Sequence, residues 1–264
     1  MVAEDQMRLV HVNLVRSFGL LPQYQSSGFV RVSRGVMVAG TGSPVAFFNE
    51  VLPVDDDVGP DAIVEAVAVA DEAGLAWMLH LREGVDDDLV PTVQASGLEE
   101  VEGYPAMVLS ALPERVPDVP GLRVKRIRDV AGFERFVDTA GSNAGHNAQL
   151  VETFLGGGII EEPDVALLLG ILDGTPVATS ISIRSGDVVG VYNVGTAEPA
   201  RRRGVGWALT AAAIQAGAEA GATTATLQSS PMAQAMYAAH GFRTLYQYRL
   251  FRRAPRATSA ETST

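Results

Sequence analysis

A run of three arginines is the feature of this sequence that points most directly to chemistry. Residues 201–203 are all arginine, and Gly204-Val205-Gly206 and an alanine-rich stretch follow them. Glycines let the chain bend so that successive backbone N–H groups face one spot, and a helix that begins there presents the positive end of its dipole. The dipole contributes only about 0.3–1 kcal/mol, so the arginines must supply much of the attraction. The segment predicts a binding site for an anion such as a pyrophosphate.

Two common phosphate-binding loops do not fit this stretch. A P-loop ends in Gly-Lys-Ser/Thr, whereas Trp207 and Ala208 occupy that place. A dinucleotide-binding fingerprint needs a third glycine three residues after Gly206, where Leu209 stands. A solvated helix start whose glycines only form a turn stays open as the simpler alternative.

Alternating strands and helices must position this loop. In the second half the pattern predicts strands over residues 122–127, 165–172, 176–184, 187–194, 224–228 and 243–251, and helices over residues 130–139, 148–155, 205–220 and 231–239. Asp173-Gly174 and Ser185-Gly186 are hairpin turns, and Gly221 is the expected stop of the third helix. The arginine run therefore lies between a strand and a helix.

The first half repeats part of this order of elements without repeating its residues. The first forty residues have poor periodicity, and only residues 28–39 alternate well enough for a strand or hairpin. The pattern then predicts strands over residues 45–52, 75–81 and 104–112, and helices over residues 61–73 and 87–95. Residues 113–121 hold three prolines and form the best linker. A length of 264 residues, at about 150 per domain, corresponds to about 1.8 domains.

The residues around the arginine run resemble a known family. Arg201-x-x-Gly204-x-Gly206 matches the Arg/Gln-x-x-Gly-x-Gly/Ala motif of the GNAT superfamily of acyl-CoA-dependent N-acyltransferases. Residues 233–242 (AQAMYAAHGF) resemble the A-x-x-L-Y-x-x-x-G-F signature of the same family. The two motifs stand in the family's order, each in its strand and helix context. The resemblance covers residues 122–251, about half of the chain.

This resemblance implies a fold class and a domain organisation. The expected fold is α/β (α+β), with a mixed, mostly antiparallel twisted sheet flanked by helices. The first half is similar to a degenerate, partial GNAT-like lobe in its order of elements, and it holds no Arg-x-x-Gly-x-Gly. We expect an N-terminal lobe over residues 1–120, an acyltransferase domain over residues 121–253 and a disordered tail over residues 254–264.

The activity that the resemblance implies is N-acyl transfer. An acetyl group would pass from acetyl-CoA, or another acyl-CoA, to a primary amine of a small molecule or peptide by direct attack in a ternary complex. The sequence has no cysteine and no Gly-x-Ser-x-Gly elbow, which agrees with direct attack by the acceptor. A non-catalytic acyl-CoA-binding sensor or interaction module and a nucleotide-binding protein stay open as alternatives.

The family's roles are carried over to the matching positions. Tyr237 is the expected general acid for the leaving thiolate, and packing on its helix face is its simpler interpretation. The backbone N–H of Val194 is the expected oxyanion donor. Ser230 stands where the family often has an asparagine. The expected cofactor contacts are Val194, Gly195, Thr196, Arg201, Arg202, Arg203, Gly204, Val205, Gly206, Trp207, Ser230 and Ala233.

The acceptor site is marked less clearly than the cofactor site. Tyr192 and Asn193, which are polar residues in an apolar strand, and His146 are expected to face the acceptor. A lysine-like amine has a pKa of about 10.4 and is mostly protonated at pH 7, so a base or water chain would help. Glu198, His146 and Glu152 are candidates for that base, and their spacing singles out none of them. A turn carboxylate and a loop histidine are the simpler interpretations of Glu198 and His146.

The charge and composition limit the partners. There are 20 basic and 31 acidic residues, a net charge of −11, which disfavours nucleic acid as a partner. Without a signal-peptide pattern or a membrane-spanning stretch, we expect a cytoplasmic protein with no membrane contact. No metal site is expected, and a homodimer is an expectation because dimers are common among the family's members. Glu161, Glu162 and Asp164 could attract a cationic amine, but a solvated face is the simpler interpretation.

Overall fold

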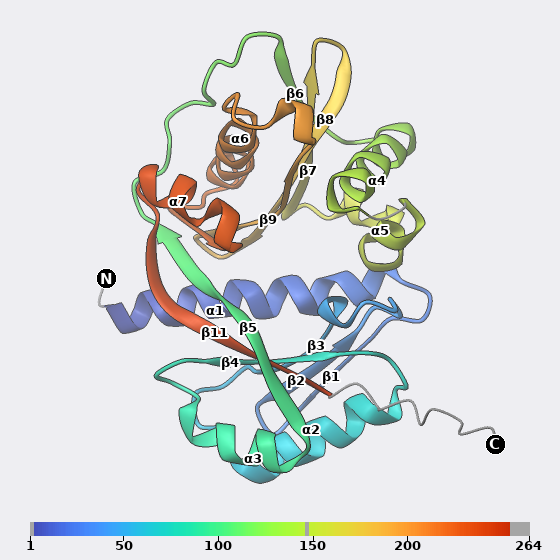
Figure 1. Cartoon of the computed structure of the whole chain (residues 1–264), viewed down its shortest axis with the longest axis vertical. Helices are drawn as coiled ribbons and strands as arrows, with labels where there is room; N and C mark the ends of the chain where they lie inside the picture. The colour runs from blue at the N-terminus through green and yellow to red at the C-terminus, as the bar shows by residue number, and fades with distance from the viewer. Residues whose placement is uncertain (1–2, 146–147, 254–264) are drawn as a thin grey trace, which may run out of the picture.

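The computed structural model describes residues 3–145 and 148–253, which form one mixed sheet with helices on its faces (Figure 1). The strands are β1 (Phe29–Ser33), β2 (Val36–Gly40), β3 (Asn49–Pro53), β4 (Met78–Arg82), β5 (Leu98–Leu109), β6 (Leu122–Arg126), β7 (Val165–Leu172), β8 (Thr175–Ser185), β9 (Val188–Thr196), β10 (Thr224–Gln228) and β11 (Arg243–Arg253). The 11 strands lie in the order β1-β2-β3-β4-β11-β5-β10-β9-β8-β7-β6. Only the pairs β3/β4 and β9/β10 are parallel in the described ladders. The expected mixed, mostly antiparallel sheet is confirmed.

Seven α-helices and five short 3-10 helices surround the sheet in the described part of the chain. The α-helices are α1 (Ala3–Leu20), α2 (Pro60–Glu72), α3 (Val90–Ala95), α4 (Val130–Ala144), α5 (Ala148–Leu155), α6 (Val205–Glu219) and α7 (Pro231–Ala239). The 3-10 helices are η1 (Leu21–Tyr24), η2 (Ala46–Phe48), η3 (Asp87–Leu89), η4 (Gly157–Glu161) and η5 (Glu198–Ala200). In Figure 1, α4 to α7 flank the upper strands, and α2 and α3 lie at the bottom.

The apolar run of β7 shows how the second half is layered. Ala166 and Leu168 pack in the cluster that contains α6, whereas Leu167 and Leu169 pack in the cluster that contains α4 and α5. Successive side chains of a strand point to opposite faces, so α6 covers one face of this sheet and α4 with α5 covers the other. A strand buried on both faces is apolar throughout, which explains why the sequence VALLLGIL shows no alternation.

The helix α1 was missed by the sequence analysis, which found only poor periodicity in the first forty residues. Its buried face does follow a helical spacing, through Val10, Leu14 and Phe18. The same face also buries His11 and Asn13, and polar residues on a buried face obscure the apolar stripe that identifies a helix. The prediction was wrong because the partners of these polar groups lie far away in the sequence.

Those partners join α1 to both halves of the molecule. The His11 ring bonds to Tyr248 Oη at 2.9 Å and to the carbonyl of Pro53 at 2.7 Å. Asn13 Nδ2 donates to the carbonyl of Ile183 at 3.0 Å. Figure 1 shows α1 running between the upper and lower parts of the sheet. The helix therefore fixes the two halves against one another.

Two predicted strands have different bounds in the structure. Residues 45–52 were predicted as one strand, but Ala46–Phe48 form η2 and β3 begins only at Asn49. The strand predicted over residues 104–112 begins at Leu98 and ends at Leu109, because residues 98–103 pair with the end of β11. Three glutamates in that segment, Glu99, Glu100 and Glu102, are partly or fully exposed, so the segment contains no apolar run that would mark it as a strand.

The sheet continues across the boundary that the sequence analysis placed at residue 120. The last strand, β11, lies between β4 and β5, and β5 pairs with β10 through Ala106 to Leu109. Figure 1 shows β5 and β11 running from the middle of the molecule into its lower part, and the two strands pair with one another from Val108 with Arg243 to Leu98 with Arg253. The division at residue 120 stays a prediction, and the tail predicted over residues 254–264 lies outside the described residues.

A buried ion pair closes the end of β4. Arg82 donates to both carboxylate oxygens of Asp86, from Nε at 2.9 Å and from a terminal nitrogen at 2.8 Å. The two side chains are 4% and 3% exposed, so both charges are removed from water. A third bond, of 2.6 Å, links Arg82 to Asp56, whose side chain is 62% exposed. The full hydrogen bonding of the Arg82–Asp86 pair offsets its desolvation.

Candidate functional site

The parallel strands β9 and β10 separate towards one end of the sheet. They pair from Val188 with Thr224 to Gly190 with Thr226. Among the described residues the ladder goes no further, so residues 191–196 of β9 continue without β10 beside them. Backbone N–H and C=O groups at such an open edge can pair with an extended ligand.

A β-bulge lies in this open part of β9. Between the pairs Thr179–Gly195 and Ile181–Tyr192, two residues of β9 face one residue of β8. Asn193 has a φ of 49°, a left-handed conformation that asparagine adopts more readily than most residues. Thr179 Oγ1 lies 3.1 Å from both oxygens of Asn193. Val194 is the second of the two bulged residues, and a bulge re-aims the backbone at its position.

The arginine run lies where β9 leads into α6, as predicted. Arg202 and Gly204 have φ values of 59° and 81°, and this alternation of backbone conformations turns successive N–H groups towards one side. Gly204 is the N-cap of α6 and makes no side-chain capping bond. The first amide of α6 to bond backward is that of Ala208, to the Gly204 carbonyl at 3.0 Å. The preceding N–H groups of the first turn have no partner within the helix.

The three arginines of the run differ in their partners, although all are exposed. Arg201 Nε donates to the carbonyl of Thr196 at 3.1 Å, which ties the loop to the end of β9. Arg203 lies 3.8 Å from Asp173, a pair whose side chains are 47% and 69% exposed and therefore weakly coupled. The structure brings all the predicted cofactor contacts of β9, the loop and α6 to one end of the sheet.

The helix α7 lies against the loop. Trp207 stacks on His240 with ring centroids 3.8 Å apart and planes 3° apart. A Cβ placed on Gly206 would meet Met236 Sδ at 3.8 Å and Thr196 Oγ1 at 3.6 Å. Ser230, the N-cap of α7, makes no capping bond through its side chain. Trp207, an expected cofactor contact, is therefore packed against the C-terminal end of α7.

A cavity of about 330 Å³ lies beside the open edge of β9. The second half contributes Tyr192, Asn193, Val194, Ser230, Ala233 and Tyr237 to its lining. The first half contributes Phe18, Phe47, Phe48 and Tyr104. The cavity therefore joins the predicted acceptor residues Tyr192 and Asn193 to the predicted acid Tyr237, and all its described lining side chains are uncharged types.

The aromatic residues from the first half are the part of the site that sequence reasoning missed. Phe47 and Phe48 lie on η2, where the sequence analysis predicted a strand, and Phe48 stacks on Phe154 with centroids 3.8 Å apart. Phe18 lies on the helix α1, which was missed altogether. The one signal in the sequence that could have indicated these cavity residues was the adjacent pair Phe47-Phe48 next to the polar residue Asn49.

Tyr237 combines burial with access to the cavity. Its residue is 5% exposed, and burial raises the pKa of its hydroxyl, while a hydrogen bond with Thr210 lowers it in part. The phenol therefore holds its proton at neutral pH. Its ring also packs against Phe242 with centroids 5.6 Å apart, so the packing interpretation and the cavity position apply to the same residue.

The base candidates from the sequence do not reach this cavity in the described structure. Glu198 is exposed in the turn η5, and Glu152 is exposed on α5. Neither lines the cavity. His146, predicted both for the acceptor and as a base, lies outside the described residues.

The acidic run of the second half is used by ion pairs. Asp164 bonds to Arg16 at 3.0 Å and to Arg184 at 2.5 Å. Glu162 accepts the hydroxyl of Tyr24 at 2.7 Å and lies 3.3 Å from Arg16. These carboxylates hold α1 and η1 against the second half, and none of them lines the cavity.

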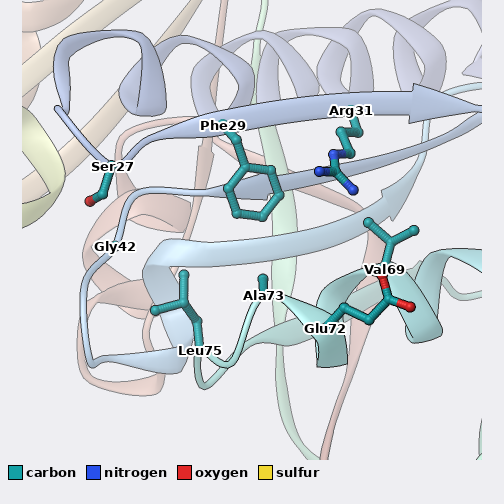
Figure 2. A pocket seen from close by; sticks show the side chains of 8 residues that line it. All are labelled: Ser27, Phe29, Arg31, Gly42, Val69, Glu72, Ala73 and Leu75. Carbon is teal, nitrogen blue, oxygen red and sulfur yellow. The ribbon is translucent and has the colours of Figure 1, made fainter.

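A larger cavity, of about 500 Å³, lies at the far edge of the first half. Figure 2 shows Phe29 and Arg31 of β1 on one side of it, and Val69 and Glu72 of α2 on the other. No residue predicted for cofactor or acceptor lines this cavity. Because the motif residues gather around the smaller cavity, the smaller one is the candidate site.

Two searches of the described residues were negative. Residues 3–145 and 148–253 contain no group of three or more His, Cys, Asp or Glu that could hold a metal ion. Within the same residues, no helix has the length and apolar character to cross a membrane.

Known proteins were compared with the chain. Residues 135–242 match the model of the acetyltransferase (GNAT) family. The structure is similar to a GCN5-related N-acetyltransferase from Kribbella flavida, with a TM-score of 0.71, 21% identity, and coverage of 94% of this chain and 96% of that one. No curated protein matches the sequence.

Two further solved structures share the fold along nearly the whole chain. A GCN5-related N-acetyltransferase from Sphaerobacter thermophilus has a TM-score of 0.60 and 14% identity, and covers 96% of this chain and 93% of its own. A tandem GNAT protein from the clavulanic acid biosynthesis pathway has a TM-score of 0.59 and 12% identity, and covers 97% and 98%. At these identities the likeness concerns the fold.

Proposed function

We propose, from the match of residues 135–242 to the acetyltransferase (GNAT) family, that the protein transfers an acetyl group from acetyl-CoA to a primary amine. The acceptor is a small molecule or a peptide amine, which attacks directly in a ternary complex. The observation that carries this proposal is the meeting of three features at one end of β9. These are an open strand edge, an uncapped helix start with arginines, and a cavity lined mainly by apolar side chains. A cytoplasmic location and a homodimer stay predictions from the sequence.

The loop before α6 fits the pyrophosphate of a coenzyme A. Gly204 adopts the left-handed φ of 81° that the turn requires, and the free N–H groups from Arg202 to Trp207 suit an anion. The edge of β9 at Val194 and Thr196 suits the amide groups of the pantetheine arm. When bound, acyl-CoA supplies an activated acyl group on a thiol that can leave.

Two groups of this chain would act on the transfer itself. Val194 belongs to the bulge in the open part of β9, and its N–H would donate to the acyl oxygen as negative charge develops there. Tyr237, which also lines the cavity, would give its proton to the leaving sulfur. The apolar lining would exclude water, which favours the amine over hydrolysis.

The proposal is tested by incubating the full chain with acetyl-CoA and a panel of primary amines. Because the protein has no cysteine, a thiol-reactive dye reports only the CoA that is released. We expect amine-dependent CoA release, and calorimetry should show tighter binding of CoA than of ATP. Absence of both release and binding would refute the proposal. Binding without release would favour an acyl-CoA sensor, and tighter ATP binding would favour a nucleotide-binding protein.

Gly204→Ala should weaken acetyl-CoA binding at least tenfold. Alanine at a φ of 81° is strained by about 1–2 kcal/mol, so the loop would shift and its N–H groups would leave their positions. A hydrogen bond to a charged group contributes about 1.5–3 kcal/mol, which sets the size of the loss. Calorimetry with acetyl-CoA measures it.

Gly221→Ala is the matched control for this variant. Gly221 follows the other end of α6 with a φ of 103°, and its surroundings are open within 4 Å. We expect the two variants to lose similar stability on thermal unfolding, with only Gly204→Ala losing affinity. Equal affinity for acetyl-CoA in both variants would contradict the assignment of this loop.

A further inference from the structure

A chain of three side chains leads from the cavity into the interior of the first half. Tyr104 of β5 lines the cavity, and its hydroxyl lies 2.9 Å from His80 Nε2 of β4. His80 Nδ1 lies 2.9 Å from Glu50 Oε2 of β3. The side chains of His80 and Glu50 are both 0% exposed. These three side chains therefore connect the cavity wall to a carboxyl group that solvent does not reach.

Glu50 has no other partner to explain its burial. Neither of its carboxyl oxygens has a hydrogen bond within the described residues, and the contact with His80 Nδ1 is short but outside hydrogen-bond geometry. Burial raises the pKa of Glu50 well above its ordinary value. Burial, and then the charge of His11, lower the pKa of His80 to about 3. The low-dielectric surroundings thus favour the neutral pair at rest, in which Glu50 carries the proton and His80 is a neutral imidazole. A proton can be taken up only when Glu50 has ionised, and the raised pKa makes that carboxylate a strong base.

The other hydroxyl groups of the cavity lead to no base. Tyr192 Oη donates to Asn13 Oδ1 at 2.7 Å, and Ser17 Oγ donates to the Leu14 carbonyl at 2.8 Å. Tyr237 contacts the hydroxyl of Thr210. The described lining of the cavity also holds no carboxylate. Within the described residues, Tyr104 is therefore the one lining side chain that connects the cavity to a titratable base.

We propose that Tyr104, His80 and Glu50 form a relay that takes the proton from the acceptor's ammonium group. This inference rests on the proposed acyl transfer to an amine. The ammonium gives one proton to the Tyr104 oxygen as Tyr104 gives its own to His80 Nε2. His80 Nδ1–H then passes to the Glu50 carboxylate. One N–H bond of the acceptor breaks, one O–H bond forms on Glu50, and the amine keeps the electron pair with which it attacks.

The direction of transfer follows from burial. An ammonium in the apolar cavity and a carboxylate in the core are both disfavoured, and the transfer neutralises both at once. The titratable groups that face His80 from the elements packed on it are Glu50 on β3, Tyr104 on β5, Tyr248 on β11 and His11 on α1. Burial lowers the pKa of His11 to about 4, so this neighbour is neutral at the working pH.

Tyr104→Phe tests the route, with acetyl-CoA and 2-phenylethylamine as the probe pair. We expect kcat/KM to fall about 100-fold at pH 7. The loss in kcat/KM should disappear as the pH approaches the pKa of the acceptor amine, because the unprotonated amine needs no relay. Tyr246→Phe is the matched control, since it removes a buried hydroxyl that bonds to Tyr248 and lies outside the cavity lining. An unchanged pH profile in Tyr104→Phe would overturn the proposal.

Glu50→Gln tests the end of the relay, because glutamine keeps the shape and cannot take the proton. Its pH profile should match that of Tyr104→Phe. Nitrogen NMR of labelled histidine gives a readout without turnover. As Glu50 ionises, the proton of His80 should move from Nε2 to Nδ1, and Glu50→Gln should abolish the move.

The two proposals fail in different ways. If His80 changes tautomer but the native protein releases no CoA with any amine, the acyltransfer proposal fails and the relay stands as a proton path. If CoA is released but His80 keeps one tautomer across the pH range, the relay is refuted and the acyltransfer proposal stands.

Discussion

Arg82→Met is expected to lower the free energy of unfolding by about 3–5 kcal/mol. The substitution leaves the Asp86 carboxylate in the core without the two guanidinium bonds of 2.9 and 2.8 Å. Asp86 keeps only the backbone N–H of residue 82, at 2.8 Å, so most of its desolvation is no longer offset. Chemical denaturation followed by circular dichroism measures the loss, with the slope of the transition expected to stay the same.

Two further variants distinguish the effect of the unpaired buried charge on stability from the effect of removing any arginine. Arg252 pairs with Glu99 at 3.2 Å, with side chains 46% and 42% exposed, so Arg252→Met should change stability by less than about 1 kcal/mol. Adding Asp86→Leu to Arg82→Met should restore part of the stability, because it removes the uncompensated charge. A double variant as unstable as the sum of its single changes would contradict this account.

Tyr237→Phe is expected to lower kcat by at least about 100-fold while leaving the binding of acetyl-CoA within a factor of about three. The ring keeps its packing on Phe242, so only the proton donor is lost. The effect should be largest above neutral pH, where solvent supplies few protons to the leaving thiolate. Steady-state kinetics across pH, with calorimetry for binding, measure both parts.

Tyr24→Phe controls for the loss of a tyrosine hydroxyl elsewhere. Tyr24 donates to Glu162 at 2.7 Å, away from the cavity lining, so its variant should keep the native kcat. If Tyr237→Phe also keeps the native kcat, the hydroxyl is a packing feature, and an acyl-CoA-binding module becomes the better description.

The second half could be read from sequence because its signals are local. The apolar runs of β7 to β9 end at glycine-containing turns, and α6 begins at the glycines that also mark the loop. Hairpin pairing follows directly from such turns, so the antiparallel order β7-β8-β9 needed little long-range information. The cofactor side of the site lies within this local pattern, which is why its position was predictable.

The acceptor side depends on contacts that are distant in the sequence. Phe18 and Tyr104 are 86 positions apart in the numbering, yet both line one cavity with Tyr237. The burial of His80 and Glu50 likewise depends on β11, which lies beside β4 only after the chain has crossed the whole second half. Hydrophobic alternation and turn residues carry no information about such long-range contacts. The base candidates predicted from the sequence therefore lie outside the cavity lining.

The position of β11 also sets the order in which the molecule can be assembled during synthesis. The strands β4 and β5 leave the ribosome long before β11, which must pair with both. At the usual rates of translation the interval between β5 and β11 is on the order of ten seconds. Through that time the facing edges of β4 and β5 are unpaired, and unpaired edges invite pairing with other chains. The first half therefore cannot complete its sheet before β11 is made, and we expect premature termination before β11 to yield an aggregation-prone product rather than a smaller folded one.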